Sequence, residues 1–150
     1  MKVQRIEIGQ SPVTTEQLKG YIGLNGECRE LELEVALSTA IDRIEDHCDV
    51  ALRTTTYRVT TAGSRYIRLP YCSANFPTIL TPDNIAQNGA EVDLGTDAAI
   101  VIEYSVEAVA DITSYIAGIL AYAALLFDGE NDPSAFALVL RRYLNTNILL

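Results

Sequence analysis

Residues 37–61 read LSTAIDRIEDHCDVALRTTTYRVTT, and within this stretch the spacing of the apolar residues changes. In the first half they recur at intervals of four, three and four, which is the period of an amphipathic helix. They are Leu37, Ile41, Ile44 and Cys48. In the second half Tyr57, Val59 and Thr61 share one face of an alternating β-branched and aromatic segment, which is typical of a strand. The stretch therefore predicts a long helix, about residues 27–52, that leads directly into β structure.

The residues after this helix contain the signals of several strands. Residues 65–69, RYIRL, follow a short turn and are expected to form a hairpin with the strand before them. Asn88-Gly89 lies between alternating neighbours and is a strong hairpin signal. Residues 98–106, AAIVIEYSV, alternate most regularly, and the first eight residues of the chain suggest an edge strand. We expect a small antiparallel sheet over about residues 53–106.

Helices are predicted on both sides of this β segment. Their expected bounds are about residues 15–22, 27–52, 112–127 and 133–145. Thr14 and Gln17 have the spacing of a capping box before the first helix. Asp111 or Thr113 is the expected cap of the third helix, and Pro133 would lie in the first turn of the last. The sequence thus predicts an α+β fold, a helical bundle with an inserted small antiparallel β-sheet, in a single domain of residues 1–150.

Composition narrows the class of protein. Hydrophobic residues make up 49% of the chain and charged residues 21%, which is typical of a globular domain. The longest apolar run, residues 115–127, is shorter than the roughly 20 residues that cross a membrane. The first ten residues, MKVQRIEIGQ, contain no apolar stretch of the signal-peptide type. We therefore expect no membrane partner, and a protein that is made in the cytoplasm or assembled there into a particle.

The net charge of −9 argues against a protein that grips nucleic acid phosphates. Its distribution is uneven, because residues 27–49 hold eight acids and two bases, whereas residues 69–140 hold ten acids and no base. Between them lie four arginines with no acid, namely Arg53, Arg58, Arg65 and Arg68. A charged block is most often a solvated face, but segregated signs also suit a surface that meets a complementary one on another copy. These arginines are the predicted contacts to a neighbouring subunit.

The side chains that could act in catalysis or bind a metal do not form a catalytic pattern. The sequence has no P-loop, no zinc-protease motif and no nucleophile elbow. The single histidine, His47, points about 100° away from its neighbours Asp46 and Cys48 if the segment is helical. Four carboxylates lie at helical spacing in the same helix, namely Asp42, Glu45, Asp46 and Asp49. They could hold Mg²⁺ or Ca²⁺, but a solvated acidic face is favoured, and we predict no catalytic, cofactor-binding or metal-binding residue.

The three cysteines, Cys28, Cys48 and Cys72, are an odd number without a disulfide spacing, so reduced and packed thiols are expected. The eight tyrosines fall on predicted strand faces and helix stripes. Base stacking normally comes with basic neighbours, so these tyrosines are interpreted as core or interface residues.

The order of several segments resembles that of phage head–tail connector (adaptor) proteins. The segments are Val13–Lys19, Leu37–Leu52, Tyr57 followed by Ile67-Arg68-Leu69-Pro70, Ile100–Tyr104 and Ile116–Phe127. In that family they correspond to the opening helix, the second helix, a strand pair that ends on Leu-Pro, the last strand and the central helix. The resemblance extends over nearly the whole chain.

This resemblance implies a structural role in the neck of a virion and no enzymatic activity. A ring of copies, commonly twelve, would lie beneath the portal protein, continue the DNA channel and dock stopper or tail proteins. DNA would pass through without specific binding, in agreement with an acidic wall that repels phosphates. The C-terminal segment would reach the portal, with Arg141, Arg142, Ile148, Leu149 and Leu150 as the candidate contacts. The alternatives are a stopper or tail-terminator protein, or a cytoplasmic α+β protein that binds a ligand or a partner.

Overall fold

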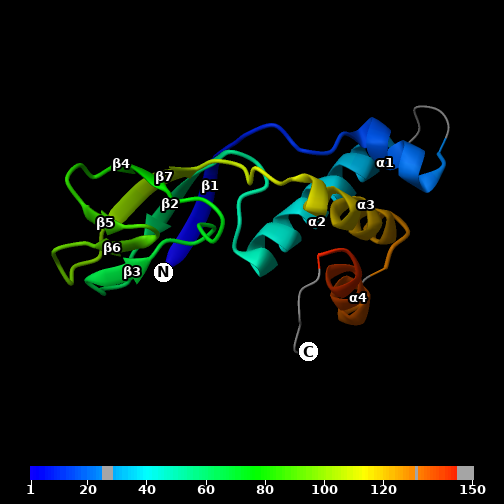
Figure 1. Ribbon diagram of the computed structural model, residues 1–150. Coiled ribbons are helices and arrows are strands. Elements are labelled where there is room, and N and C mark those ends of the chain that lie inside the picture. Colours follow the sequence, from blue (N-terminus) through cyan, green and yellow to red (C-terminus); the bar gives the residue numbers. More distant parts are fainter. Residues whose placement is uncertain (25–28, 131, 145–150) are drawn as a thin grey trace. The chain divides into compact units, whose positions relative to one another are not determined.

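The computed structural model describes residues 1–24, 29–130 and 132–144, and its helices and antiparallel strands confirm the α+β class (Figure 1). The elements in chain order are β1 (Lys2–Ile8), α1 (Thr15–Ile22), α2 (Glu30–Cys48), β2 (Thr55–Thr60), β3 (Tyr66–Arg68), β4 (Thr78–Thr81), β5 (Ala86–Asn88), β6 (Glu91–Asp93), β7 (Val101–Val106), α3 (Thr113–Phe127) and α4 (Pro133–Tyr143). Helix α2 ends four residues earlier than predicted, because Asp49 adopts a left-handed backbone conformation with φ 55°.

The chain divides into two compact units, which are described separately below. The first comprises Met1–Gln10 and Glu45–Ala110 and contains all of the described strands. The second comprises Ser11–Ile44 and Asp111–Leu150 and contains α1, α3, α4 and most of α2. The division falls within α2, between Ile44 and Glu45.

The strands of the first unit form two antiparallel sheets, where the sequence had suggested one. The four-stranded sheet has the order β1-β2-β7-β4, and the three-stranded sheet has the order β3-β6-β5. The predicted hairpin between β2 and β3 is therefore wrong, since β2 pairs with β1 and β7 while β3 pairs with β6. The long strand β7 offers β2 six residue pairs, which include Tyr57 with Tyr104 and Val59 with Ile102. A three-residue strand such as β3 cannot match that pairing.

The predicted turn at Asn88-Gly89 and the edge strand at the N-terminus are both confirmed. Strands β5 and β6 form a hairpin in which Asn88 pairs with Glu91, and Gly89 has a positive φ of 61°. A side chain at Gly89 would also approach the ring of Phe76 to 3.1 Å. Strand β1 lies at the edge of its sheet.

The core of the first unit is built from alternate residues of β2 and β7, as their sequence pattern predicted. Tyr57, Val59, Ile102, Tyr104 and Val106 are all buried. The tyrosine rings of the two strands lie 5.3 Å apart between their centroids. Removing such side chains from water contributes roughly 1.5–3 kcal/mol each, so these two strands hold the unit together.

The second unit is a group of helices in which α3 packs against α1 and α4. Its buried residues lie mainly on α2, α3 and α4, and the predicted α2 stripe of Leu37, Ile41 and Ile44 is among them. They include Leu33, Leu37, Ala40, Ile41, Ile44, Ile119, Tyr122, Ala123, Ala137 and Leu140. Within the described part of the chain, no helix has both the length and the apolar character needed to cross a membrane.

The ends of these helices confirm some predicted caps and correct one. Thr14 and Gln17 form the expected capping box at the start of α1. At the start of α4 the side chain of Asp132 accepts a hydrogen bond from the Ser134 amide, directly before the first-turn proline. The prediction that Asp111 or Thr113 caps α3 is wrong, because the N-cap residue is Ile112 and no side chain caps it. Helix α3 is stabilised by burial of its apolar surface, so it does not depend on a polar cap.

Candidate functional site

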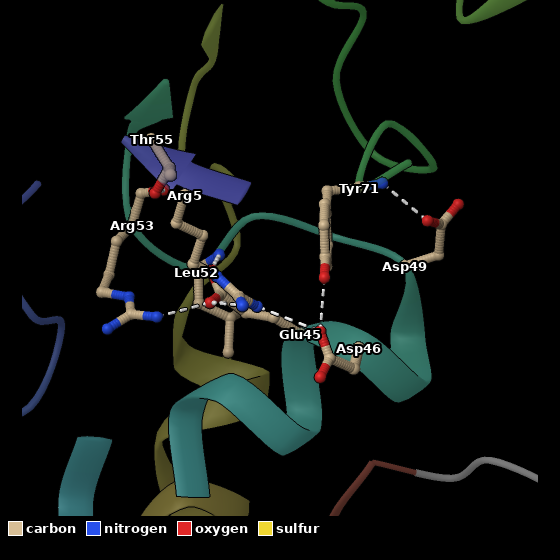
Figure 2. A network of polar contacts seen from close by, with 8 residues as sticks. All are labelled: Arg5, Glu45, Asp46, Asp49, Leu52, Arg53, Thr55 and Tyr71. Atoms are coloured by element: carbon tan, nitrogen blue, oxygen red, sulfur yellow. Dashed lines mark hydrogen bonds and ion pairs between the residues drawn. The ribbon is translucent and has the colours of Figure 1, made fainter. Parts of the chain in front are cut away.

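Polar side chains of the first unit converge where α2 ends and the chain turns into β2, as Figure 2 shows. The carboxylate of Glu45 is fully buried. One of its oxygens accepts a hydrogen bond from the Leu52 amide at 2.7 Å, and the other accepts one from the Arg53 guanidinium at 2.7 Å. A guanidinium nitrogen of Arg5 lies 3.6 Å from the same oxygen that Arg53 contacts. Two cations and a carboxylate thus share a site in which Glu45 and Arg53 are buried and Arg5 is 20% exposed.

Asp46, the next residue of the helix, joins this site to the loop after β3. Its Oδ1 atom accepts hydrogen bonds from Arg5 at 3.0 Å and from the Tyr71 hydroxyl at 2.5 Å. With Asp46 included, the cations Arg5 and Arg53 face two carboxylates, so the group is electrically balanced. Within the group, Glu45 and Arg53 are the buried charges and need each other because an uncompensated buried charge costs several kcal/mol, whereas Asp46 is 54% exposed.

Asp49 holds the same loop through its backbone and its side chain. Its Oδ1 atom accepts a hydrogen bond from the Tyr71 amide at 2.6 Å, and its Oδ2 atom accepts one from the Ser73 hydroxyl at 2.7 Å. The Asp49 carbonyl accepts a further bond from the Ser73 amide at 3.0 Å. Both Asp49 and Tyr71 have positive φ values, 55° and 67°. Such backbone conformations cost free energy in residues with a side chain, and these hydrogen bonds compensate for that cost.

The ring of Tyr71 also belongs to an ordered column of side chains. The Arg5 guanidinium lies 5.0 Å from its centroid, and the Tyr57 ring stacks on it at 4.7 Å with an interplanar angle of 10°. Burial, followed by the hydrogen bond to Asp46, raises the pKa of Tyr71 to about 12. Burial likewise raises the pKa of Tyr57 and of Tyr104. These hydroxyls therefore stay protonated at any physiological pH.

We call the set Arg5, Glu45, Asp46, Asp49, Arg53 and Tyr71 the polar cluster. It holds no group that is prepared for catalysis, because its carboxylates are engaged by cations and amides. The nearby thiol of Cys72 has a pKa raised to about 12 by burial, so it is not a nucleophile at neutral pH. Among the residues that the structure describes, no group of three or more His, Cys, Asp or Glu side chains is arranged to hold a metal ion. The polar cluster connects the end of α2 to β1 and to the loop after β3 through ion pairs and hydrogen bonds.

This geometry corrects the interpretation of the acids Asp42, Glu45, Asp46 and Asp49 as a solvated face at Glu45, whereas Asp46 is exposed as predicted. Glu45 lies four residues after Ile41 and so continues the buried stripe of the helix. That position was the one sequence signal that could have revealed a buried carboxylate, and the partner Arg5 has no signal at all. His47 is exposed, as expected for a residue outside the cluster.

The four arginines predicted to contact a neighbouring subunit each have an acidic partner within the first unit. Arg53 is buried beside Glu45, so its side chain does not reach the surface. The other three are exposed, and their pairs and separations are Arg58 with Glu103 at 2.7 Å, Arg65 with Asp93 at 2.7 Å and Arg68 with Asp49 at 3.5 Å. The positive and negative charges that are segregated along the sequence therefore form ion pairs in the folded first unit.

The residues predicted to contact the portal are only partly described. Arg141 and Arg142 are exposed in the last turn of α4. Ile148, Leu149 and Leu150 lie outside the described residues.

The surface of each unit is hollowed by open grooves. In the first unit a groove of about 550 Å³ lies over the three-stranded sheet, with Tyr66 68% exposed at its side. In the second unit one groove of about 440 Å³ lies beside α2, and another of about 370 Å³ lies among α1, α3 and α4.

The sequence matches no family model, and it matches no curated protein. Among solved structures, the chain is similar to a chain in the neck of an empty gene transfer agent (GTA) particle computed with C6 symmetry, with a TM-score of 0.67 at 15% identity. The match covers 99% of this chain and 98% of that one. The two chains share one fold. A chain in the virion of the native GTA particle matches with a TM-score of 0.62 at 14% identity and the same two coverages.

Proposed function

We propose that this protein is a structural subunit of the neck of a phage-like particle, namely a head–tail connector (adaptor) that forms a ring beneath the portal. The observation that carries the proposal is the end-to-end agreement with the GTA neck chain, which covers 99% of one chain and 98% of the other. Because the match extends over nearly the full length of both chains, the likeness concerns the whole architecture and not one common motif. It also agrees with the order of segments that resembles head–tail connectors.

A structural and non-enzymatic role is supported by the chemistry of the polar cluster. Its carboxylates are engaged in ion pairs and hydrogen bonds, and the hydroxyl of Tyr71 and the thiol of Cys72 both have pKa values near 12. A catalytic acid or base needs a pKa near the working pH. The cluster instead attaches the last residues of α2 to β1 and to the loop after β3 within the first unit, which is a structural role.

The assembly that we propose is a closed ring of identical copies. An assembly of identical chains with C6 symmetry contains six copies or a multiple of six, and the neighbouring neck structure was computed with that symmetry. The twelve copies implied by the resemblance to connectors are one such multiple. In the ring the exposed Arg58, Arg65 and Arg68 are proposed to lie near a neighbouring copy.

The proposed partners are the portal on one side, stopper or tail proteins on the other, and DNA in the lumen. With a net charge of −9, the ring would repel phosphates, so DNA would pass without specific binding. The segment 145–150, next to Arg141 and Arg142, is proposed to reach the portal. Assembly would take place in the host cytoplasm.

Light scattering after size-exclusion chromatography, together with negative-stain imaging, tests this function. We expect ring-shaped particles whose mass is six times the 16.4 kDa of the chain or a multiple of that, either from the purified protein alone or on addition of the portal from the same particle. A protein that stays monomeric at high concentration and does not bind that portal would overturn the proposal. If a small ligand also raised its thermal midpoint, the alternative of a cytoplasmic binding protein would be supported.

A further inference from the structure

We propose that neighbouring copies in the ring, besides the arginine contacts of the first unit, also meet through two faces of the second unit. In this contact the exposed face of α4 around Leu138 packs into the groove beside α2 of the next copy. The inference rests on the proposed function, because a ring of identical chains needs two different surfaces that fit each other. Such a head-to-tail contact closes into a ring when its rotation allows.

The first surface is the solvent face of α4, called here the α4 face, which consists of Ser134, Leu138, Arg141 and Arg142. Leu138 is 62% exposed although three residues near it, Ala137, Val139 and Leu140, are buried. The two arginines follow it at i+3 and i+4, so they lie one turn along the same face. Helix α4 contains no acidic residue. The surface thus has an apolar centre with a positively charged end.

The second surface is the groove beside α2, called here the α2 groove. Its apolar walls come from Leu31, Val35 and Ala36 of α2 and from Leu126 and Phe127 at the end of α3. Leu31 is 73% exposed and Val35 is 57% exposed, and they stand one above the other at i and i+4. Two adjacent apolar side chains that face water at the mouth of a groove provide a place for another apolar side chain, such as Leu138 of the next copy.

The charges around the α2 groove complement the α4 face. Glu32 and Glu34 are exposed on either side of the apolar pair, and Glu32 also pairs with Arg29. Arg43, at the far end of the groove, donates a hydrogen bond to the Tyr122 hydroxyl, which directs it into its own unit. Glu32 lines the groove and Glu34 lies on the other side of the apolar pair, so these two acids are proposed to face Arg141 and Arg142 of a second copy. Complementary charges around an apolar centre are the usual arrangement of a specific protein interface.

The two surfaces face away from each other, as ring closure requires. On the side of Leu138, α3 contributes Ala121, Ala124 and Leu125, which form one stripe at i, i+3 and i+4. On the side of the α2 groove it contributes Leu126 and Phe127. At 100° per residue, Leu126 and Phe127 point on average to the opposite side of the α3 axis from that stripe, about half a turn around the helix. One copy can thus contact two different neighbours with its two surfaces.

Two single substitutions and their mixture test this contact. Val35→Asp places a charge in the α2 groove, and Leu138→Asp places one on the α4 face. Both positions are exposed, so circular dichroism and the thermal midpoint should match wild type. Each variant alone should lose ring assembly, with the association constant reduced about tenfold to a hundredfold by loss of one buried apolar side chain. Ile8→Asp, at a comparably exposed apolar position in the first unit, is the matched control and should assemble normally.

The decisive measurement is an equimolar mixture of the two variants. Each copy of one variant keeps the surface that fits the intact surface of the other, so the mixture should yield a one-to-one heterodimer and no ring. If either variant forms rings like wild type, or if the mixture stays monomeric, the proposed contact is wrong, whereas ring formation by wild type still supports the proposed function. For weak assembly, oxidation of the double variant Val35→Cys and Leu138→Cys should give a ladder of cross-linked multimers that neither single cysteine variant gives. Absence of this ladder at high concentration would also overturn the contact.

Discussion

Replacing Glu45 with alanine is the most direct test of the polar cluster. The substitution removes a carboxylate with no exposed surface and takes the ion-pair partner away from Arg53, whose side chain is 6% exposed. It also removes the acceptor of the buried Leu52 amide. Breaking a buried ion pair by removing one partner costs about 3–5 kcal/mol, because the other charge stays buried. We take this as the total effect, since the lost amide bond belongs to the same site and the two costs do not add.

A loss of this size is large for one domain-sized chain, whose free energy of unfolding is typically about 5–15 kcal/mol. At about 2–4 °C per kcal/mol for this chain length, the thermal midpoint should fall by about 6–20 °C. The measurement is urea unfolding followed by far-ultraviolet circular dichroism, with the thermal midpoint as a second value. Glu45→Gln, which keeps an acceptor oxygen for the Leu52 amide, should lie between alanine and wild type.

The matched control is Glu103→Ala, which breaks the pair with Arg58 on the surface of the sheet. The side chains of that pair are 30% and 44% exposed, and exposed ion pairs contribute only about 0–1 kcal/mol. If Glu45→Ala costs no more than this control, the buried cluster does not stabilise the first unit and the reasoning about Glu45 is refuted.

Three further predictions concern the surface and the tail. Charge reversal of both Arg58 and Arg68 should weaken ring assembly and leave the circular dichroism of the monomer unchanged, and normal rings from the double variant would remove these residues from the interface. Deletion of residues 146–150 should abolish portal binding without lowering the thermal midpoint, whereas a midpoint several degrees lower with binding retained would place the tail in the core. Hydrogen bonds from Lys19 and from Thr15 lower the pKa of Glu30, so its contribution to stability is present above the unfolded pKa of about 4.3 and is lost as the pH falls through the folded value. Unfolding curves between pH 6 and pH 3 should show this loss of stability, and the loss should be smaller in Glu30→Gln. If the free energy of unfolding falls equally with pH in the two proteins, the assignment is wrong.

The sequence by itself determined the elements that depend on neighbours along the chain. Helix α1 begins and ends at the predicted residues, because its capping box with Thr14 is a contact over three positions. The hairpin of β5 and β6 follows from Asn88-Gly89, since this turn needs residues that accept a positive φ. The buried faces of β2 and β7 follow from alternation with period two. Each of these features has its cause within a few residues, so it can be read before the fold is known.

The tertiary structure alone decided which distant residues meet. The partner of β2 is β7 and not the nearer β3, because strand length and the fit of the buried tyrosine pair outweigh proximity in sequence. Glu45 is buried rather than solvated because Arg5 of β1, which is distant in the sequence, lies beside it and compensates its charge. The arginine-rich segment is neutralised by acids such as Glu103, 45 residues after Arg58 along the chain. Register and the long-range pairing of charges depend on the packing of whole strands, which no local pattern encodes.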